Sequence, residues 1–211
     1  MKKWLCLLFV GVLLLCNTAC SNAADTPSDP SAHVVQKSDI DEIQIFLNDP
    51  ANNGFIQSDY SSPEHISLYR VFYDGGGVGT KGTTDWTEQE KQDVLVATGW
   101  DAYHNPPLKL KRDAVKMVVK EKLGISLSDV KVDLNENFCY VEKYDAYYAM
   151  HGDTDYESIV ITKVLYDDNG NYCVDYTVKD ALIPTNGIVT LRKVDNGFQF
   201  ISNKSTKQIK E

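Results

Sequence analysis

The chain has 211 residues and a mass of 23.7 kDa, which is room for one domain or two small ones. Hydrophobic residues make up 43% and charged residues 24%, which excludes a chain that is disordered throughout and a membrane protein with many spans. The 30 acidic and 21 basic residues give a formal charge of −9, which argues against nucleic acid as a partner because phosphate binding needs a basic face.

The first 19 residues have the composition of an export signal. Two lysines precede a 13-residue apolar run, residues 4–16, which is too short to cross a bilayer of about 30 Å as a helix. Ala19 followed by Cys20 resembles the bacterial lipoprotein signal, in which the cysteine is lipidated and becomes the mature N-terminus. We therefore expect a signal peptide over residues 1–19, a lipid at Cys20 and a location on the outer face of the bacterial cell membrane.

Asn17 departs from the lipoprotein pattern, which usually has leucine or a similar residue there. A plain secretory signal cleaved near Ala23 or Ala24 and a retained membrane anchor therefore stay open as alternatives. Removal of the signal takes away its two lysines, which leaves 19 basic and 30 acidic residues and a charge of −11. Residues 20–37 are too polar to offset their ordering entropy and are expected to form a flexible tether. Residues 38–211 are expected to form one domain.

The first half of that domain has helical patterns. We expect helices over residues 40–47, 63–73, 88–98 and 111–123. The first is capped by Ser38 or Asp39, the second by Ser62 and the third by the capping box that starts at Thr87. Gly99 ends the third helix and Gly124 ends the fourth. Leu68–Tyr73 is equally compatible with a strand. Asn52-Asn53-Gly54 predicts a turn, residues 74–84 a glycine-rich loop, and Pro106-Pro107 a break.

After residue 124 the hydrophobic period changes to two, which is typical of strands. Strands are expected at 138–142, 147–151, 158–166, 171–178, 187–194 and 198–202. The turns Asp167–Gly170 and Asp195–Gly197 each end in Asn-Gly, the dipeptide that accepts positive φ in a tight hairpin. Helices followed by an antiparallel meander predict an α+β domain whose helices pack on one face of the sheet.

Gly77-Val78-Gly79-Thr80-Lys81-Gly82 matches the glycine pattern of dinucleotide-binding loops. That site requires a preceding strand, a helix that opens at the end of the loop, and a βαβ unit. Here a further stretch of residues precedes the next predicted helix, and the rest of the chain has no parallel-sheet pattern. We therefore expect an ordinary loop here, and no cofactor.

The most concentrated polar stretch is His151–Glu157, which contains Asp153 and Asp155. Oxygen ligands spaced by two are compatible with calcium, but the glycine and glutamate of the twelve-residue calcium loop do not fit when Asp153 is placed first. A turn between strands is the favoured interpretation. No metal site and no catalytic residue is predicted, and the alternative is an extracytoplasmic hydrolase or cell-wall-polymer enzyme that uses His151, Asp153 and Asp155.

Cys139 and Cys173 both lie in predicted strands of an exported chain, so a disulfide between them and two buried thiols are both open. Eight of the twelve tyrosines fall between Tyr140 and Tyr176, including the adjacent pair Tyr147 and Tyr148. Neighbouring strand residues face opposite ways, so we expect one of the pair to pack inward and the other to meet solvent or a ligand. Tyr147, Tyr148, His151 and Asp153 are the candidate ligand-binding residues.

Residues 109–122 contain six basic residues and two acidic ones, in a domain that is otherwise acidic. A solvated helix face is the simpler interpretation. A face directed at anionic lipid or a wall polymer is the sharper one, because a tether would hold it beside the membrane.

Four segments carry a resemblance to uncharacterised lipoproteins and secreted proteins of Gram-positive anaerobes: Phe46–Phe55, Val71–Gly76, Glu142–Thr154 and the Gly187–Asn203 hairpin. The resemblance spans roughly residues 40–203 and implies an exported location and a shared fold, with no activity attached. By element order, the C-terminal part also resembles cystatin-like and nuclear-transport-factor-like folds. We expect a surface-tethered domain without catalytic activity that binds a glycan, peptide or protein, and no nucleic acid.

Overall fold

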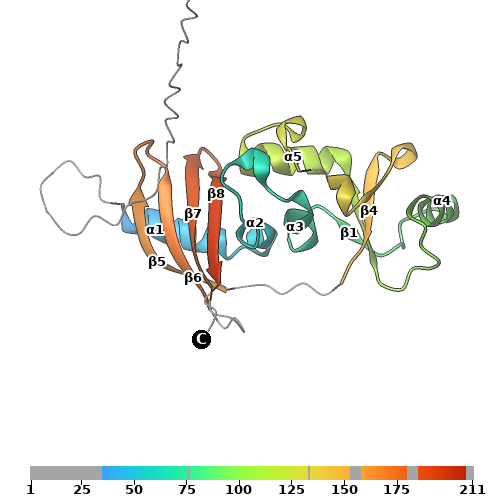
Figure 1. Ribbon diagram of the computed structural model, residues 1–211, viewed down its shortest axis with the longest axis horizontal. Coiled ribbons are helices and arrows are strands. Elements are labelled where there is room, and N and C mark those ends of the chain that lie inside the picture. Colours follow the sequence, from blue (N-terminus) through green and yellow to red (C-terminus); the bar gives the residue numbers. More distant parts are fainter. Residues whose placement is uncertain (1–34, 76, 133, 153–157, 180–184, 208–211) are drawn as a thin grey trace, which may run out of the picture. The chain divides into compact units, whose positions relative to one another are not determined.

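Helices dominate the first half of the chain and antiparallel strands the second, which confirms the predicted α+β class (Figure 1). The computed structural model describes residues 35–75, 77–132, 134–152, 158–179 and 185–207, all within one compact unit that spans His33–Glu211. The helices are α1 (Lys37–Leu47), α2 (Asn53–Ile56), α3 (Leu68–Tyr73), α4 (Glu88–Thr98) and α5 (Arg112–Leu123). The strands are β1 (Thr80–Lys81), β2 (Pro107–Lys111), β3 (Cys139–Val141), β4 (Ala146–Met150), β5 (Ser158–Tyr166), β6 (Tyr172–Lys179), β7 (Thr185–Val194) and β8 (Gly197–Lys207).

These strands form two antiparallel sheets, with the orders β1-β2-β4-β3 and β5-β6-β7-β8. The second sheet is the expected meander. The expectation that one meander includes all the strands after residue 138 is wrong, because β4 pairs with β2 and β3 pairs with β4, and neither joins the later strands. Strand β2 begins at the second proline of the pair and was not predicted. Its first residue, Pro107, stands where proline is tolerated in a strand.

The two predicted hairpin turns are confirmed. Gly170 has a φ of +76° between β5 and β6, and Gly197, the first residue of β8, has a φ of +116°. The Asp167 carboxylate accepts hydrogen bonds from the backbone N–H groups of Asn169 and Asn171, at 2.9 and 2.8 Å. The Asp167 side chain therefore supports the backbone geometry that the sequence of the first turn predicts.

The helix signals gave mixed results. Helix α4 begins after Thr87, whose hydroxyl accepts the Glu90 N–H at 3.0 Å, and it ends at Gly99 as predicted. Helix α1 begins after Gln36 and not at Ser38 or Asp39, because the Asp39 carboxylate instead pairs with Lys193. The segment after Ser62 divides into a short 3-10 helix, Pro63–His65, and the separate helix α3, so Leu68–Tyr73 is helical and not a strand.

The turn predicted at Asn52-Asn53-Gly54 is helical instead. Asn52 ends a 3-10 helix, Pro50–Asn52, and Asn53 and Gly54 begin α2. Gly54 is required here by close packing of α2 on α3, since a Cβ atom would lie 2.4 Å from the carbonyl oxygen of Arg70. The glycine that suggested a turn therefore allows two helical segments to approach each other.

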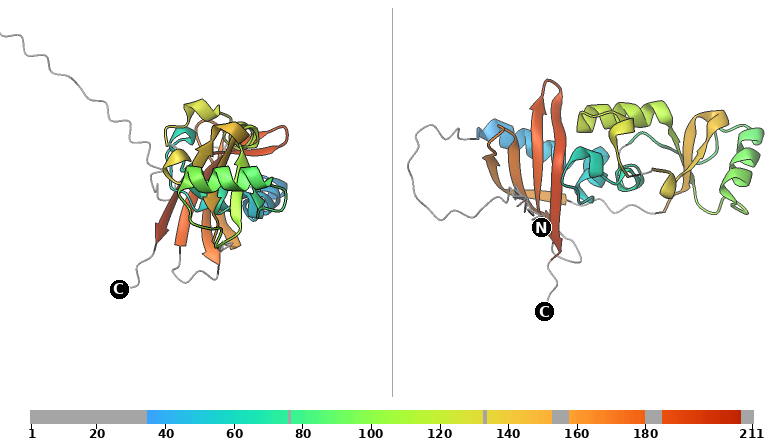
Figure 2. Two further views of the ribbon diagram at one scale, coloured as in Figure 1. Left: turned by 90° about the vertical axis from the view of Figure 1, so that its right-hand side faces the viewer. Right: turned by 45° about the horizontal axis from the view of Figure 1, so that its top comes forward.

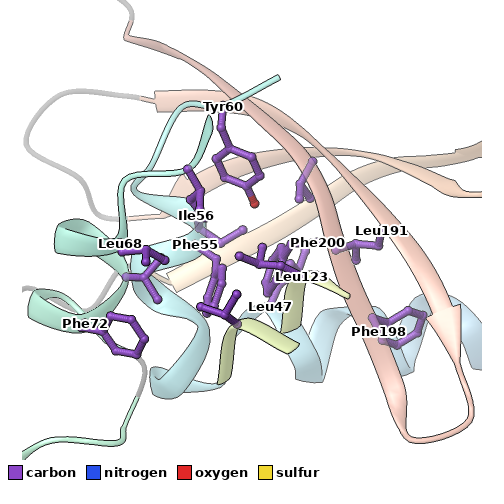
Figure 3. Packing of buried hydrophobic residues seen from close by; sticks show 14 of the residues in the cluster. Leu47, Phe55, Ile56, Tyr60, Leu68, Phe72, Leu123, Leu191, Phe198 and Phe200 are labelled. Atoms are coloured by element: carbon purple, nitrogen blue, oxygen red, sulfur yellow. The ribbon is translucent and has the colours of Figure 1, made fainter. Parts of the chain in front are cut away.

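The main hydrophobic cluster combines helices α1, α2, α3 and α5 with strands of both sheets (Figure 3). Phe55 of α2 stacks on Phe200 of β8 with 4.6 Å between ring centroids. Along β6, alternate residues from Tyr172 to Val178 are buried, so one face of this sheet packs against the helices. Figure 3 shows Leu47 and Leu123, from α1 and α5, beside the Phe55–Phe200 stack.

Helix α5 contacts β2 of the first sheet and β8 of the second (Figures 1 and 2). A second, smaller cluster is formed by Trp86, Val94, Ala146 and Tyr148, where α4 packs on β4. Each face of β4 therefore belongs to a different hydrophobic cluster. Among the described helices, none has the length and apolar character that crossing a membrane would need.

Candidate basic groove

A groove of about 560 Å³ runs along helix α5. Helix α5 supplies basic side chains, the segment after α5 supplies polar and apolar ones, and α3 and β4 supply apolar ones. The lining residues are Leu68, Arg112, Lys116, Lys120, Ser126, Leu127, Ser128, Val130, Lys131, Val132, Leu134 and Tyr147. The volume is within the range of small-molecule sites, roughly 300–1,000 Å³.

Four cationic side chains surround this groove. Arg112, Lys116 and Lys120 are spaced four residues apart on α5, which places them along one side of the helix. Lys131 lines the groove from the segment that follows. Among the described residues that line it, none is acidic. The groove therefore has a local positive charge in a chain whose formal charge is −9.

The groove cations have neighbours that are themselves exposed to solvent. Lys116 lies 2.7 Å from the Asp113 carboxylate, and this hydrogen bond holds the pKa of Asp113 below its usual value. Arg112 lies 3.9 Å from Asp145, with its guanidinium 5.7 Å from the centre of the Tyr140 ring. Because exposed ion pairs contribute about 0–1 kcal/mol, an incoming anion can replace the carboxylates at low cost.

The floor of the groove is apolar. Leu68 and Tyr147 are buried, and Leu134 is buried beside them. Leu127 and Val130 pack partly on the same cluster from the outer side. The arrangement places cations beside an apolar surface, a combination that is typical of ligand-binding sites.

The basic segment noted in the sequence is divided by the fold. Lys109 does not reach the groove, because its ammonium is nearly buried against the Glu90 carboxylate at 2.5 Å, and Tyr148 donates to the same oxygen at 2.7 Å. Arg112, Lys116 and Lys120 do line the groove. Lys131 lies outside the charge run and was missed, because only the folded chain brings it beside α5.

Tyr147 and Tyr148 face opposite sides of β4, as expected, but neither is exposed. Tyr147 is 8% exposed in the main cluster and forms part of the groove floor. Tyr148 is fully buried in the second cluster. The expectation that one of the pair meets solvent is wrong, because α4 covers the face of β4 that would otherwise be open.

His151 is buried and in contact with α3. Its Nε2 lies 3.0 Å from the carbonyl oxygen of Tyr73, and its ring stacks on the Tyr73 ring at 4.8 Å. It lines a cavity of about 140 Å³ together with Gly75, Gly77 and Gly79. Asp153 and Asp155 lie outside the described residues, as does Cys20.

The two cysteines lie in different sheets. Cys139 belongs to β3 and Cys173 to β6, and both are thiols, so the candidate disulfide is not formed. The reason is topological, since the sequence pattern placed both in one meander and β3 belongs to the other sheet. The pKa of the Cys139 thiol is raised by its burial.

The glycine-rich stretch at residues 77–82 contains the short strand β1 and follows helix α3, so it lacks the preceding strand of a dinucleotide loop. In the described part of the chain, no group of three or more histidine, cysteine, aspartate or glutamate side chains is placed to hold a metal ion.

Comparisons with known proteins found no similar protein. No protein-family model matches the chain, and no curated protein or solved structure matches it either.

Proposed function

We propose that this protein is a binding module that is exported, lipid-anchored through Cys20, and holds a linear phosphate-bearing polymer in the groove along α5. The observation that carries the proposal is the set of four cations around an apolar floor without an acidic lining residue in the described chain. The export and the anchor are supported by residues 1–20 of the sequence alone.

The spacing of the cations favours a chain-like anion. Residues four apart on a helix rise by about 6 Å, so Arg112, Lys116 and Lys120 form a row with a regular step. Successive negative groups along an extended polymer can each meet one cation of such a row. Lys131 faces the same groove and adds a contact from the other side.

The apolar floor and the concave form of the groove favour such a polymer over a nucleic acid or an anionic membrane surface. A nucleic acid would need exposed rings for its bases, and the only aromatic residue of the described lining, Tyr147, is buried. A flat membrane surface would not enter a groove whose buried floor lies below the lysines. A polymer with a short aliphatic unit between its phosphates matches both the cations and the apolar floor.

The test is a calorimetric titration of the mature protein with poly(glycerol phosphate). Because a lysine near a dense anionic ligand contributes about 1 kcal/mol, and reversal adds repulsion, Lys116→Glu with Lys120→Glu should weaken binding by more than about tenfold. The matched control is Lys163→Glu with Lys204→Glu, two exposed lysines of the other sheet.

Equal weakening in the control pair, or no binding by the wild-type protein, would contradict the proposal. A parallel arm uses vesicles that contain phosphatidylglycerol. Binding to these vesicles that depends on Lys116 and Lys120, without binding to the polymer, would replace the polymer with the membrane surface.

A further inference from the structure

A second pocket, of about 450 Å³, shares no lining residue with the basic groove. Strand β4 contributes Tyr147 to the groove and Tyr148, Ala149 and Met150 to this pocket. The other walls come from α3, from the end of α4 with Trp100, and from Asn135 and Asn137–Cys139. We propose that this pocket binds a neutral saccharide, as a site separate from the groove.

Five of the residues that line this pocket are aromatic. Tyr69 and Tyr73 of α3 lie with their rings 4.9 Å apart, and Phe138 meets Tyr69 edge-on at 5.7 Å. Trp100, which follows α4, is half-buried and is held edge-on by Tyr103 at 6.0 Å. These rings are fixed by their neighbours, and the partly exposed ones offer flat apolar surface of the kind on which the C–H face of a pyranose ring packs.

Two side-chain amides belong to the pocket. Asn135 and Asn137 are exposed at its rim, whereas the Thr98 hydroxyl donates to the Val94 carbonyl oxygen of its own helix at 2.6 Å. A side-chain amide donates and accepts at neighbouring atoms, which matches adjacent sugar hydroxyls that do the same. Tyr73 is further fixed because its hydroxyl accepts the Gly152 N–H at 2.7 Å.

The uncharged lining of the pocket disfavours ionic ligands, and its amides disfavour purely apolar ones. In the described part of the chain, no charged side chain lines it. An ionic ligand would lose hydration without gaining a counter-charge, and a purely apolar ligand would bury the rim amides without hydrogen bonds. A neutral ligand with one apolar face and a hydroxyl edge satisfies both kinds of wall.

Cys139 offers a direct test because it lines this pocket, whereas Cys173 lies in the other sheet. The full mature protein is treated with iodoacetamide at pH 8.5, with and without a trimer of N-acetylglucosamine or maltotriose. Mass spectrometry then follows the alkylation of each cysteine peptide separately. At a sugar concentration about ten times Kd, the alkylation of Cys139 should slow by about tenfold while that of Cys173 is unchanged.

Asn137→Ala, a change at an exposed lining position, should reduce this protection, and Asn105→Ala, a change at an exposed position outside the pocket, should not. Protection by only one of the two sugars identifies the ring that the pocket prefers. Each sugar is titrated up to its solubility limit. An alkylation rate of Cys139 that stays the same at every concentration of both sugars would overturn the inference. The result is independent of the polymer titration, which uses other residues and another ligand.

Discussion

Tyr147 and Tyr148 are consecutive residues of β4, and each is buried in a different hydrophobic cluster. Tyr147 lies under the basic groove, and Tyr148 donates a hydrogen bond to Glu90 on the other side of the strand. One strand therefore forms part of the floor of the groove and part of the wall of the second pocket. Substitutions on its two faces should separate the stability of the fold from binding in the groove.

Tyr148→Phe should destabilise the protein by about 1–2 kcal/mol, because the buried Glu90 carboxylate loses a donor at 2.7 Å. Urea unfolding measures the change. The matched control is Tyr60→Phe, since the Tyr60 hydroxyl is also buried but has no hydrogen-bond partner among the described residues. The control should be neutral or stabilising; an equal loss in both variants would show that the hydroxyl of Tyr148 contributes nothing specific.

Lys109→Met should cost roughly 3 kcal/mol of unfolding free energy, because it leaves the buried Glu90 carboxylate without its cation. Adding Glu90→Gln should recover much of that loss, since the uncompensated charge is then removed. Lys111→Met is the control, being the same change at an exposed position of the same strand. If Lys109→Met and Lys111→Met have the same small effect in urea unfolding, the buried ion pair does not have the predicted role.

Asn203→Leu should be among the most destabilising single changes, at roughly 3 kcal/mol or more. The Asn203 side chain is fully buried, and its Nδ2 donates to the carbonyl oxygens of Ile56 and Ser58, each at 2.8 Å. Its Oδ1 accepts the Tyr176 hydroxyl at 3.0 Å. Of these three bonds of Asn203, Tyr176→Phe removes the last and leaves the other two, so it should cost about 1 kcal/mol. Thermal and urea unfolding should rank the two variants in this order; a reversed order would contradict the assignment.

Asp93 should stabilise the fold by an amount that decreases as the pH falls into the acid range. Its carboxylate accepts hydrogen bonds from Lys143, Tyr144 and Gln89, and these lower its pKa from 3.8 to about 2. A lowered carboxyl pKa stabilises the fold above pH 4, and this contribution is lost as the pH falls from about 4 to about 2. The melting temperature of Asp93→Asn should therefore lie below that of the wild type at pH 6 and approach it at pH 2. A gap that stays constant over this range would exclude the linkage.

Features with a local cause were predictable from the sequence. Helix α4 follows from Thr87 and Gly99, whose capping bond and φ of +71° involve only near neighbours. The hairpin at Asp167–Gly170 follows in the same way from its own side chains. Such signals do not depend on what the rest of the chain does.

Features with a distant cause were not predictable. Strand β2 exists because it pairs with β4, from Pro107 with Met150 to Lys111 with Ala146, and a single sequence gives no sign of that pairing. The same pairing removes β3 and β4 from the predicted meander. The burial of Tyr148 likewise depends on Trp86 and Val94, more than 50 residues earlier in the chain.

The candidate site was predictable in part. The charge run indicated a basic face on the helix that ends at Gly124, and three of its members line the groove. Lys131 and the apolar floor of Leu68 and Tyr147 were not predictable, because they reach the groove from other elements. The aromatic wall that contains Trp100 was missed for the same reason.

The most direct test of the central claim is the salt dependence of polymer binding. A ligand that meets four cations releases their counterions, so a plot of log K against log salt concentration should have a slope of about −3 for the wild-type protein. Lys116→Glu with Lys120→Glu should flatten the slope to about −1, while Lys163→Glu with Lys204→Glu should leave it near the wild-type value. A slope that is equal in all three proteins would contradict binding of the polymer in the groove along α5.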